Sequence, residues 1–166
     1  MINKDQYLAA MRHEANVCQH LFGKIPEGTW DYRPTDGQRS TIELLRYLPH
    51  NLGSIPETVV SGDWKGIGPK MQRTKEMPAD AFCAEIDAQY DRLVKLFAGL
   101  SEDDFQTRQA TMPDGRTMAL GPALLMFGLS FMTAYKMQLF LYIKSNGVPN
   151  MGTADCWRGV DTQPKK

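Results

Sequence analysis

The spacing of apolar residues predicts a chain built mainly from helices. In residues 5–22 apolar side chains recur every three or four positions, which places them on one face of a helix: Leu8, Met11, Ala15, Cys18 and Phe22. Gly23 follows as a C-terminal cap. The same spacing returns after residues 40, 78 and 122. We therefore predict four helices, over 5–22, 40–60, 78–100 and 122–146.

The second predicted helix has a defined start and an interruption. Ser40 and Glu43 form the pattern of a capping box, in which each side chain accepts a hydrogen bond from the other residue's backbone N–H. Pro49 lies inside the apolar repeat and removes one backbone hydrogen bond. We expect the helix to bend at Pro49 without ending there.

The connections between the helices are rich in proline and glycine. Residues 24–39 and 61–77 read as long loops, with Trp64 laid over one end of the bundle. Pro-Asp-Gly at 113–115 predicts a small β-hairpin within 101–120. Residues 148–166 read as an extended tail anchored by Trp157 and frayed at its end. The sequence thus predicts one all-α domain over 1–166, an up-down four-helix bundle with long connections.

The fourth predicted helix is apolar on nearly every side. Residues 124–143 are long enough to cross a membrane, but Lys136 and Gln138 fall within them. A central lysine costs roughly 3 kcal/mol on insertion, so a buried helix is the better interpretation. Four helices leave one face of it uncovered, and we therefore expect a homodimer with this helix near the interface.

Composition excludes several classes of function. Nineteen basic residues balance nineteen acidic ones, so no long-range field attracts nucleic acid or an anionic membrane. The polar segment MINKDQYLAAMRHE does not fit a signal peptide. Three cysteines without metal-binding spacing indicate reduced thiols in the cytoplasm, with Cys18 in the core and Cys156 the more accessible thiol.

Several motifs together resemble one protein family. They are the W-x-x-R-P loop (Trp30, Arg33, Pro34), the R-S-x-x-E-L-L-R start of the second helix, and AYKMQLFLYIKSNG in the fourth. In this order and spacing the chain resembles the DinB/YfiT-like superfamily of four-helix bundles. The resemblance implies a divalent metal held by three histidines, one from the second helix and an H-x-x-x-H pair from the fourth, and thiol-dependent transferase or isomerase chemistry.

The matched positions in this sequence lack all three histidines. The position on the second helix is Tyr47, and with Gln138 as the register mark the fourth helix presents Phe131 and Tyr135. Phenylalanine cannot bind a metal, and a phenol with a pKa of about 10 is a poor ligand at neutral pH. The resemblance therefore implies a member of the family without the usual Zn or Ni site.

Two interpretations of these positions remain open. Tyr47 and Tyr135 either fill the space of the ion as buried side chains or serve as polar handles for a small ligand in a residual apolar cleft, with Gln138 nearby. His50 is either a partly exposed helix histidine or a replacement ligand, together with groups such as Glu14. We expect a metal-free small-molecule-binding or stress-associated protein. A thiol-dependent transferase that uses a metal or a cofactor thiol is the alternative.

Overall fold

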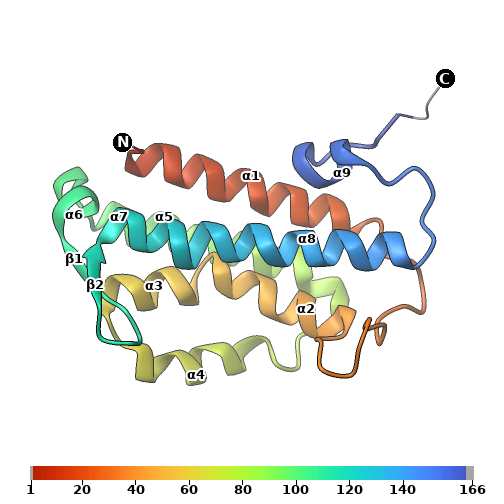
Figure 1. The fold of residues 1–166 in the computed structure, drawn as a ribbon, viewed down its shortest axis with the longest axis horizontal. Coiled ribbons are helices and arrows are strands. Elements are labelled where there is room, and N and C mark those ends of the chain that lie inside the picture. Colours follow the sequence, from red (N-terminus) through yellow and green to blue (C-terminus); the bar gives the residue numbers. More distant parts are fainter. Residues whose placement is uncertain (1, 164–166) are drawn as a thin grey trace.

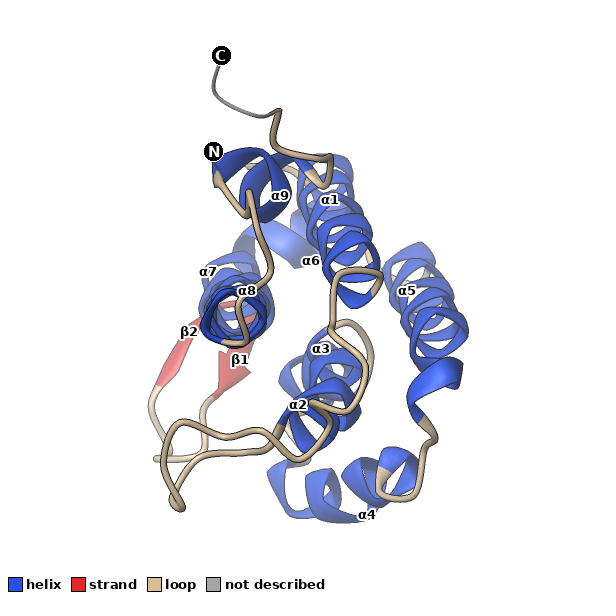
Figure 2. Ribbon diagram, turned by 90° about the vertical axis from the view of Figure 1, so that its right-hand side faces the viewer, coloured by secondary structure: helices blue, strands red, loops and turns tan. Residues whose placement is uncertain are grey.

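The computed structural model describes residues 2–163, and it shows an elongated helical bundle (Figure 1). Four layers surround the core when the bundle is viewed along its length: α1 (Lys4–Phe22), α5 (Phe82–Ala98), the α2–α3 segment, and the long helix that ends in α8 (Figure 2). The short helix α4 (Ile67–Met71) lies outside this arrangement, against α3. The all-α four-helix bundle predicted from the sequence is confirmed.

Helix α1 begins and ends close to the predicted limits because its caps are local. Asn3 accepts a hydrogen bond from the backbone N–H of Gln6, and the Gln6 side chain accepts one from the backbone N–H of Asn3. The capping box predicted at the second helix is also present, with Ser40 N–H donating to Glu43 Oε2 at 2.7 Å. Both helices therefore begin where their own sequences specify.

The second predicted helix is in fact divided, and the expectation that it bends without ending was wrong. Helix α2 covers Thr41–Tyr47, a 3₁₀ turn follows at Leu48–Asn51, and α3 covers Ser54–Ser61. Pro49 cannot donate a backbone hydrogen bond, and Gly53 comes four residues later without a side chain that could cap α3. The break changes the direction of the chain beside the site described below.

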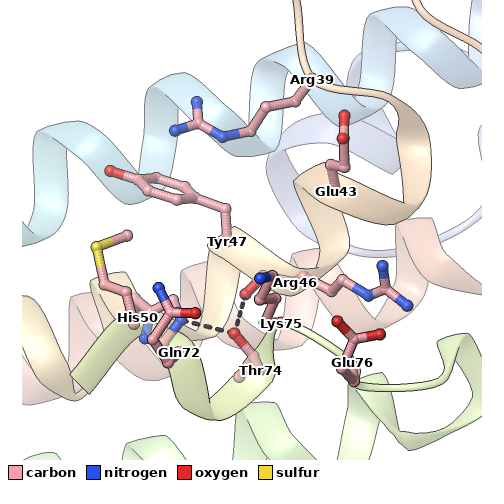
Figure 3. A pocket seen from close by; sticks show the side chains of 10 residues that line it. Arg39, Glu43, Arg46, Tyr47, His50, Gln72, Thr74, Lys75 and Glu76 are labelled. Carbon is pink, nitrogen blue, oxygen red and sulfur yellow. Dashed lines mark hydrogen bonds between the residues drawn. The ribbon is translucent and has the colours of Figure 1, made fainter. Parts of the chain in front are cut away.

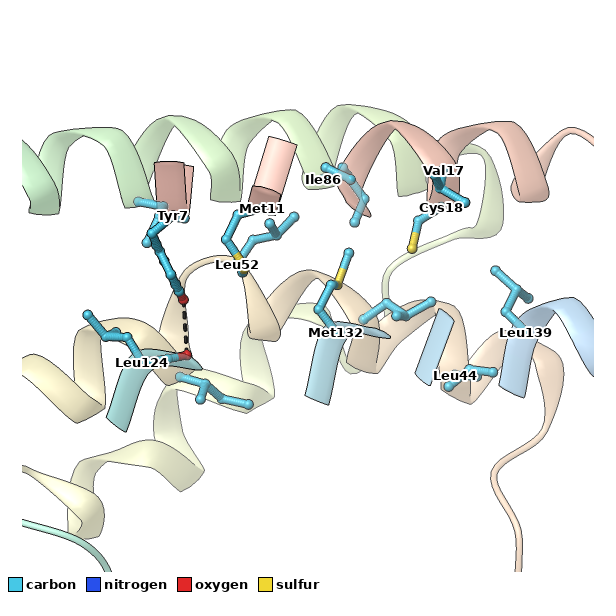
Figure 4. Packing of buried hydrophobic residues seen from close by; sticks show 14 of the residues in the cluster. Tyr7, Met11, Val17, Cys18, Leu44, Leu52, Ile86, Leu124, Met132 and Leu139 are labelled. Atoms are coloured by element: carbon cyan, nitrogen blue, oxygen red, sulfur yellow. Dashed lines mark hydrogen bonds between the residues drawn. The ribbon is translucent and has the colours of Figure 1, made fainter. Parts of the chain in front are cut away.

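The fourth helix is continuous from Leu120 to Ser145 but irregular. It consists of α7 (Leu120–Leu124), a π-helical turn at Leu125–Leu129 and α8 (Ser130–Ser145). The turn contains Gly128, whose missing side chain leaves room for the hydroxyl of Tyr7. Tyr7 donates from this position to the carbonyl oxygen of Leu124 at 3.3 Å (Figure 4). The hydroxyl of a side chain on α1 thus lies against the distorted turn of the long helix.

Lys136 in the middle of α8 is fully buried and lies 2.7 Å from Glu14 on α1. Within residues 2–163, the helix that contains it is the one long and apolar enough to cross a membrane. The lysine in its centre forms an ion pair inside the bundle, as a core helix of a folded domain would arrange it. One third of the residues in its most apolar window are buried, and most of the others in the helix are partly buried.

The connections hold more structure than the sequence indicated. The 61–77 connection contains α4 between two 3₁₀ turns, Trp64–Gly66 and Gln72–Thr74, and a third 3₁₀ turn at Ala79–Ala81 precedes α5. Trp64 Nε1 donates to the carbonyl oxygen of Thr111 in the hairpin. That hairpin was predicted, and it pairs β1 (Gln109–Thr111) antiparallel with β2 (Thr117–Ala119). Helix α6 (Glu102–Thr107), which precedes it, was not.

The C-terminal segment corrects a second expectation. Residues 148–166 are not simply extended, because Thr153–Arg158 forms helix α9, which packs on α1 and α8. Cys156 is 1% exposed, so the view of it as the accessible thiol was wrong. Trp157 contacts the bundle as expected, with its ring centre 4.6 Å from Lys136 Nζ. The expected fraying falls partly on residues 164–166, which lie outside the described part of the chain.

The core contains most of the residues on the predicted apolar faces. Cys18 is fully buried there, and burial raises the pKa of its thiol far above the usual range. It acts as a small apolar side chain, as predicted. Figure 4 shows side chains from each layer meeting in this core, among them Met11, Cys18, Leu44, Leu52, Ile86, Met132 and Leu139.

Candidate ligand-binding site

A hollow of about 380 Å³ opens beside the break between α2 and α3 (Figure 3). One wall comes from the end of the 24–39 loop, α2 and the 3₁₀ turn after it, and the other from the segment after α4. The side chains that line it are mostly charged or polar: Arg39, Glu43, Arg46, Tyr47, His50, Met71, Gln72, Thr74, Lys75 and Glu76. The hollow therefore combines charged groups with the apolar surfaces of Tyr47 and Met71.

Tyr47, which lines this hollow, packs against a second tyrosine from another helix. The rings of Tyr47 on α2 and Tyr135 on α8 pack edge to face, with their centres 4.6 Å apart. Burial, followed by the neighbouring Tyr135, raises the pKa of Tyr47 to about 12, so its phenol stays protonated at neutral pH. The guanidinium carbon of Arg39 lies 4.0 Å from the centre of the Tyr47 ring and 5.4 Å from that of Tyr135. The pair of phenols therefore supports a cation above it.

His50 lies at the inner end of the hollow and is 1% exposed, not partly exposed as the sequence suggested. Thr74 uses its only hydroxyl hydrogen to donate to the carbonyl oxygen of Arg46, so it accepts from His50 Nε2–H at 2.6 Å. His50 Nδ1 then accepts from the hydroxyl of Ser54 at 3.1 Å. Both ring nitrogens of the neutral imidazole are occupied by these contacts.

The charge state of His50 agrees with this hydrogen bonding. Burial and, to a lesser extent, the positive charge of Arg73 lower the pKa of His50 to about 4. The imidazole is therefore neutral near pH 7, with its proton on Nε2. The hydrogen bonds of this imidazole link the 3₁₀ turn to the segment around Thr74.

Comparison with known proteins identifies the fold. No family model and no curated protein matches the sequence. Among solved structures, the crystal structure of the DinB-like protein YjoA from Bacillus subtilis aligns with 89% of this chain and 96% of its own, with a TM-score of 0.67 and 17% sequence identity. The chain has the DinB-like fold. At this identity the likeness establishes the architecture, and the chemistry of the site has to be argued from its own residues.

The three residues that the motif resemblance matches to metal-ligand positions separate into two groups in the structure. Tyr47 lines the hollow and its ring contacts that of Tyr135. Phe131 does not line it, and its ring packs 5.5 Å from that of Phe127, which in turn contacts Trp64. The fold thus brings together the two tyrosines that the alignment of motifs singled out, and it places Phe131 in a neighbouring aromatic cluster.

Gln138 lies beside a second, wider hollow that shares Arg39 and Glu43 with the first. Its Nε2 donates to the hydroxyl of Tyr142, and that hydroxyl donates to the carbonyl oxygen of Arg39 at 2.8 Å. Gln138 therefore holds the backbone at Arg39 in place from α8. The side chain predicted as a neighbour of the cleft acts through this hydrogen-bond chain.

The W-x-x-R-P loop positions Arg39 from the other side. Arg33 Nη1 donates to the carbonyl oxygen of Gln38, and Arg33 Nη2 lies 3.4 Å from Glu43 Oε2. The backbone N–H of Ile42 donates to the carbonyl oxygen of Trp30 at 2.9 Å. As predicted, Arg33 ties the loop down through a backbone carbonyl, and Trp30 packs on the bundle. The loop thereby positions Arg39 beside the rings of Tyr47 and Tyr135.

Sequence reasoning missed the cations of this site. Arg39 and Arg46 were noticed only as parts of a motif, and Lys75 was not considered. Arg39 directly precedes the capping box, so the sequence indicated that it lies at the N-terminus of a helix. Lys75 lies in a segment that had the composition of a loop, and only the packing of α4 on α3 brings it opposite Arg46.

Proposed function

We propose that this protein binds a small organic carboxylate, without a metal, in the hollow beside Tyr47. The observation that supports this most is the state of Arg39. Its guanidinium lies over the rings of Tyr47 and Tyr135, and within residues 2–163 it makes no ion pair and donates no hydrogen bond. A guanidinium carries five N–H donors, so this one keeps its full donor capacity for a ligand.

The chemistry of the lining favours an anion with a planar acceptor. A guanidinium offers two parallel N–H groups that match both oxygens of a carboxylate, and stacking on an aromatic ring fixes the direction of this fork. Arg46 and Lys75 add two more cations to the lining, against Glu43 and Glu76. Glu43 also accepts a hydrogen bond from the Ser40 backbone and lies close to Arg33, so its negative charge opposes the cations of the hollow less strongly.

The size of the hollow suits a small ligand. About 380 Å³ lies within the usual range of small-molecule pockets, roughly 300–1,000 Å³. Met71 and the exposed edge of Tyr47 provide apolar contact beside the charged groups. A carboxylate attached to a short chain or to a single ring satisfies both features of the lining.

The donor atoms near Tyr47 support the metal-free part of the proposal. The phenol of Tyr47 stays protonated at neutral pH because its pKa is raised to about 12, and Phe131 has no donor atom. His50 uses both ring nitrogens for Thr74 and Ser54. These residues do not fit a transition metal, which needs three or four convergent N, O or S donors. The thiol-dependent transferase implied by the family resemblance gains no support from this donor set.

The proposal can be tested by isothermal titration calorimetry with acetate, succinate and benzoate. We expect at least one of these carboxylates to bind, and Arg39→Ala to weaken that binding at least about tenfold, since a charge-assisted hydrogen bond contributes roughly 1.5–3 kcal/mol. Arg39→Lys should restore only part of the affinity, because an ammonium lacks the bidentate fork. Arg116→Ala is the matched control, since Arg116 lies in the hairpin and pairs with Asp114. No binding by the panel, or equal binding by Arg39→Ala, would contradict the proposal.

We also propose that the protein forms a homodimer through the outer face of the long helix. Met126 and Leu141 on this helix are 48% and 51% exposed, so two large apolar side chains of the helix face water. Burying them against a second copy would remove this surface from water. Leu141→Lys should then give monomers in sedimentation velocity, whereas Val94→Lys on α5, another exposed apolar position, should not. A wild-type protein that sediments as a monomer would refute this part.

A further inference from the structure

Three potential metal ligands meet where the C-terminal segment crosses α1. His20 Nε2 lies 2.9 Å from Asp155 Oδ1 and 3.9 Å from Asp161 Oδ1. The three ligand atoms all lie within 4.8 Å of one another. Metal–ligand distances of 2.0–2.2 Å place the donors around one zinc ion roughly 3–4 Å apart. The cluster therefore already has about the spacing that a single ion requires.

Asp155 is held in the orientation that a ligand needs. Its carboxylate is 2% exposed, and Oδ2 accepts backbone hydrogen bonds from Gly152 at 3.1 Å and Thr162 at 3.3 Å. These two contacts leave Oδ1 directed at His20. In metal sites, outer hydrogen bonds of this kind fix the ligating carboxylate before the ion arrives.

The cluster borders a space that a metal-bound water could occupy. A small hollow of about 180 Å³ adjoins it, and Asp155, Asp161 and Thr162 line this hollow. The side chain of Thr162 is partly buried beside Asp155. A zinc ion with three protein ligands keeps one position for water, and the hollow leaves room for that water.

Lys24 is the group that competes with a metal at this place. Its Nζ lies 2.7 Å from Asp161 Oδ1, so the cluster is balanced by a lysine in the structure. The side chain of Asp161 is 69% exposed, however, and an ion pair exposed to this extent contributes little stability. Three convergent ligands bind a divalent ion far more strongly than one surface lysine holds one carboxylate. We therefore expect a divalent ion to displace Lys24 from Asp161.

We propose that His20, Asp155 and Asp161 form a zinc(II) site that fastens the C-terminal segment to α1. Zinc binds through the three side chains and keeps water in its remaining position, and Lys24 turns away into solvent. A site with one imidazole and two carboxylates suits zinc and similar first-row ions better than magnesium. This site involves α1 and the segment after α8, and it is independent of the carboxylate hollow at Tyr47.

The experiment is a zinc chloride titration of the untagged protein, followed by calorimetry and by competition with a chromogenic chelator. We expect one zinc ion per chain. Loss of an outer hydrogen bond alone weakens metal sites about 10- to 100-fold, so His20→Ala and Asp161→Asn should each weaken binding by at least that much. Asp161→Asn changes an exposed residue and keeps the test valid if His20→Ala is poorly folded. His13→Ala, which removes another histidine of α1, should bind zinc as the wild type does.

The variant Lys24→Gln distinguishes a metal site from a cluster that serves only to form ion pairs. It removes the competing cation, so zinc should bind at least as tightly as to the wild type. The proposal is overturned if the wild type binds no zinc, if His20→Ala and Asp161→Asn bind it with unchanged affinity, or if Lys24→Gln binds it more weakly. Equal affinity for magnesium chloride would overturn the assignment to zinc. A carboxylate titration of the same Asp161→Asn protein should match the wild type, because that hollow uses other residues.

Discussion

Replacing Lys136 by methionine should strongly destabilise the protein, although the new side chain is similar in size and apolar. Lys136 is 0% exposed, and Glu14, which lies 2.7 Å away, is 8% exposed. Neither paired atom has a further hydrogen-bond partner in the described residues. The variant would leave the carboxylate of Glu14 inside the bundle without its counter-charge.

The size of the effect follows from this burial. Removing one partner of a buried ion pair typically costs about 3–5 kcal/mol, because the remaining charge is left uncompensated. For a domain of this size, 1 kcal/mol shifts the melting temperature by roughly 2–4 °C, so a loss of roughly 6–20 °C is expected. The double variant Glu14→Leu with Lys136→Met removes both charges. Its stability should return to within about 1 kcal/mol of the wild type, or exceed it.

Urea unfolding followed by circular dichroism measures these differences, provided that the slope of the transition stays constant between variants. Lys144→Met is a matched control on the same helix, because Lys144 is exposed and has no carboxylate partner among residues 2–163. It should change stability by less than about 0.5 kcal/mol. The reasoning fails if Lys136→Met loses less than about 1 kcal/mol, or if the double variant is no more stable than Lys136→Met alone.

Two further predictions concern His50 and Gly128. Because the pKa of His50 is lowered to about 4, the unfolded chain binds more protons than the folded one between pH 6.5 and 4, so stability should fall as the pH falls through this window, by roughly 3 kcal/mol. His50→Gln should flatten this part of the profile measured by urea unfolding, and an unchanged slope would contradict the assignment. In Gly128→Ala the new Cβ would lie 2.2 Å from the hydroxyl of buried Tyr7, and we expect a loss of about 1–3 kcal/mol. Gly68→Ala, with open space at Cβ, is the control, and adding Tyr7→Phe should recover part of the loss in thermal melting.

The candidate site shows how far motif reasoning reaches. The order of motifs led to Tyr47 and Tyr135, and the fold brings their rings together. It did not indicate that Arg39 lies over them, because the position of the Arg39 backbone depends on a hydrogen bond from Tyr142, 103 residues further along the chain. His50 was noticed, but its burial depends on Thr74, 24 residues further along the chain.

The corrections have a common origin in long-range contacts. Helix α9 was not predicted because six residues cannot form a stable helix alone, and its polar groups are fixed by α1, 135 residues away in the case of His20 and Asp155. The π-helical turn in the fourth helix likewise lies against Tyr7 from α1. No local spacing encodes either feature.

The sequence by itself determined the helices and their limits wherever the deciding contacts are local. The apolar repeat of α1, the capping box of Ser40 and Glu43, and the proline in the second helix act through neighbours three or four residues away. Tertiary structure decided the rest: the burial of Lys136 and His50, and the meeting of Arg39 with two tyrosines. These features depend on which helices pack together, and packing energy is shared among residues far apart in the chain.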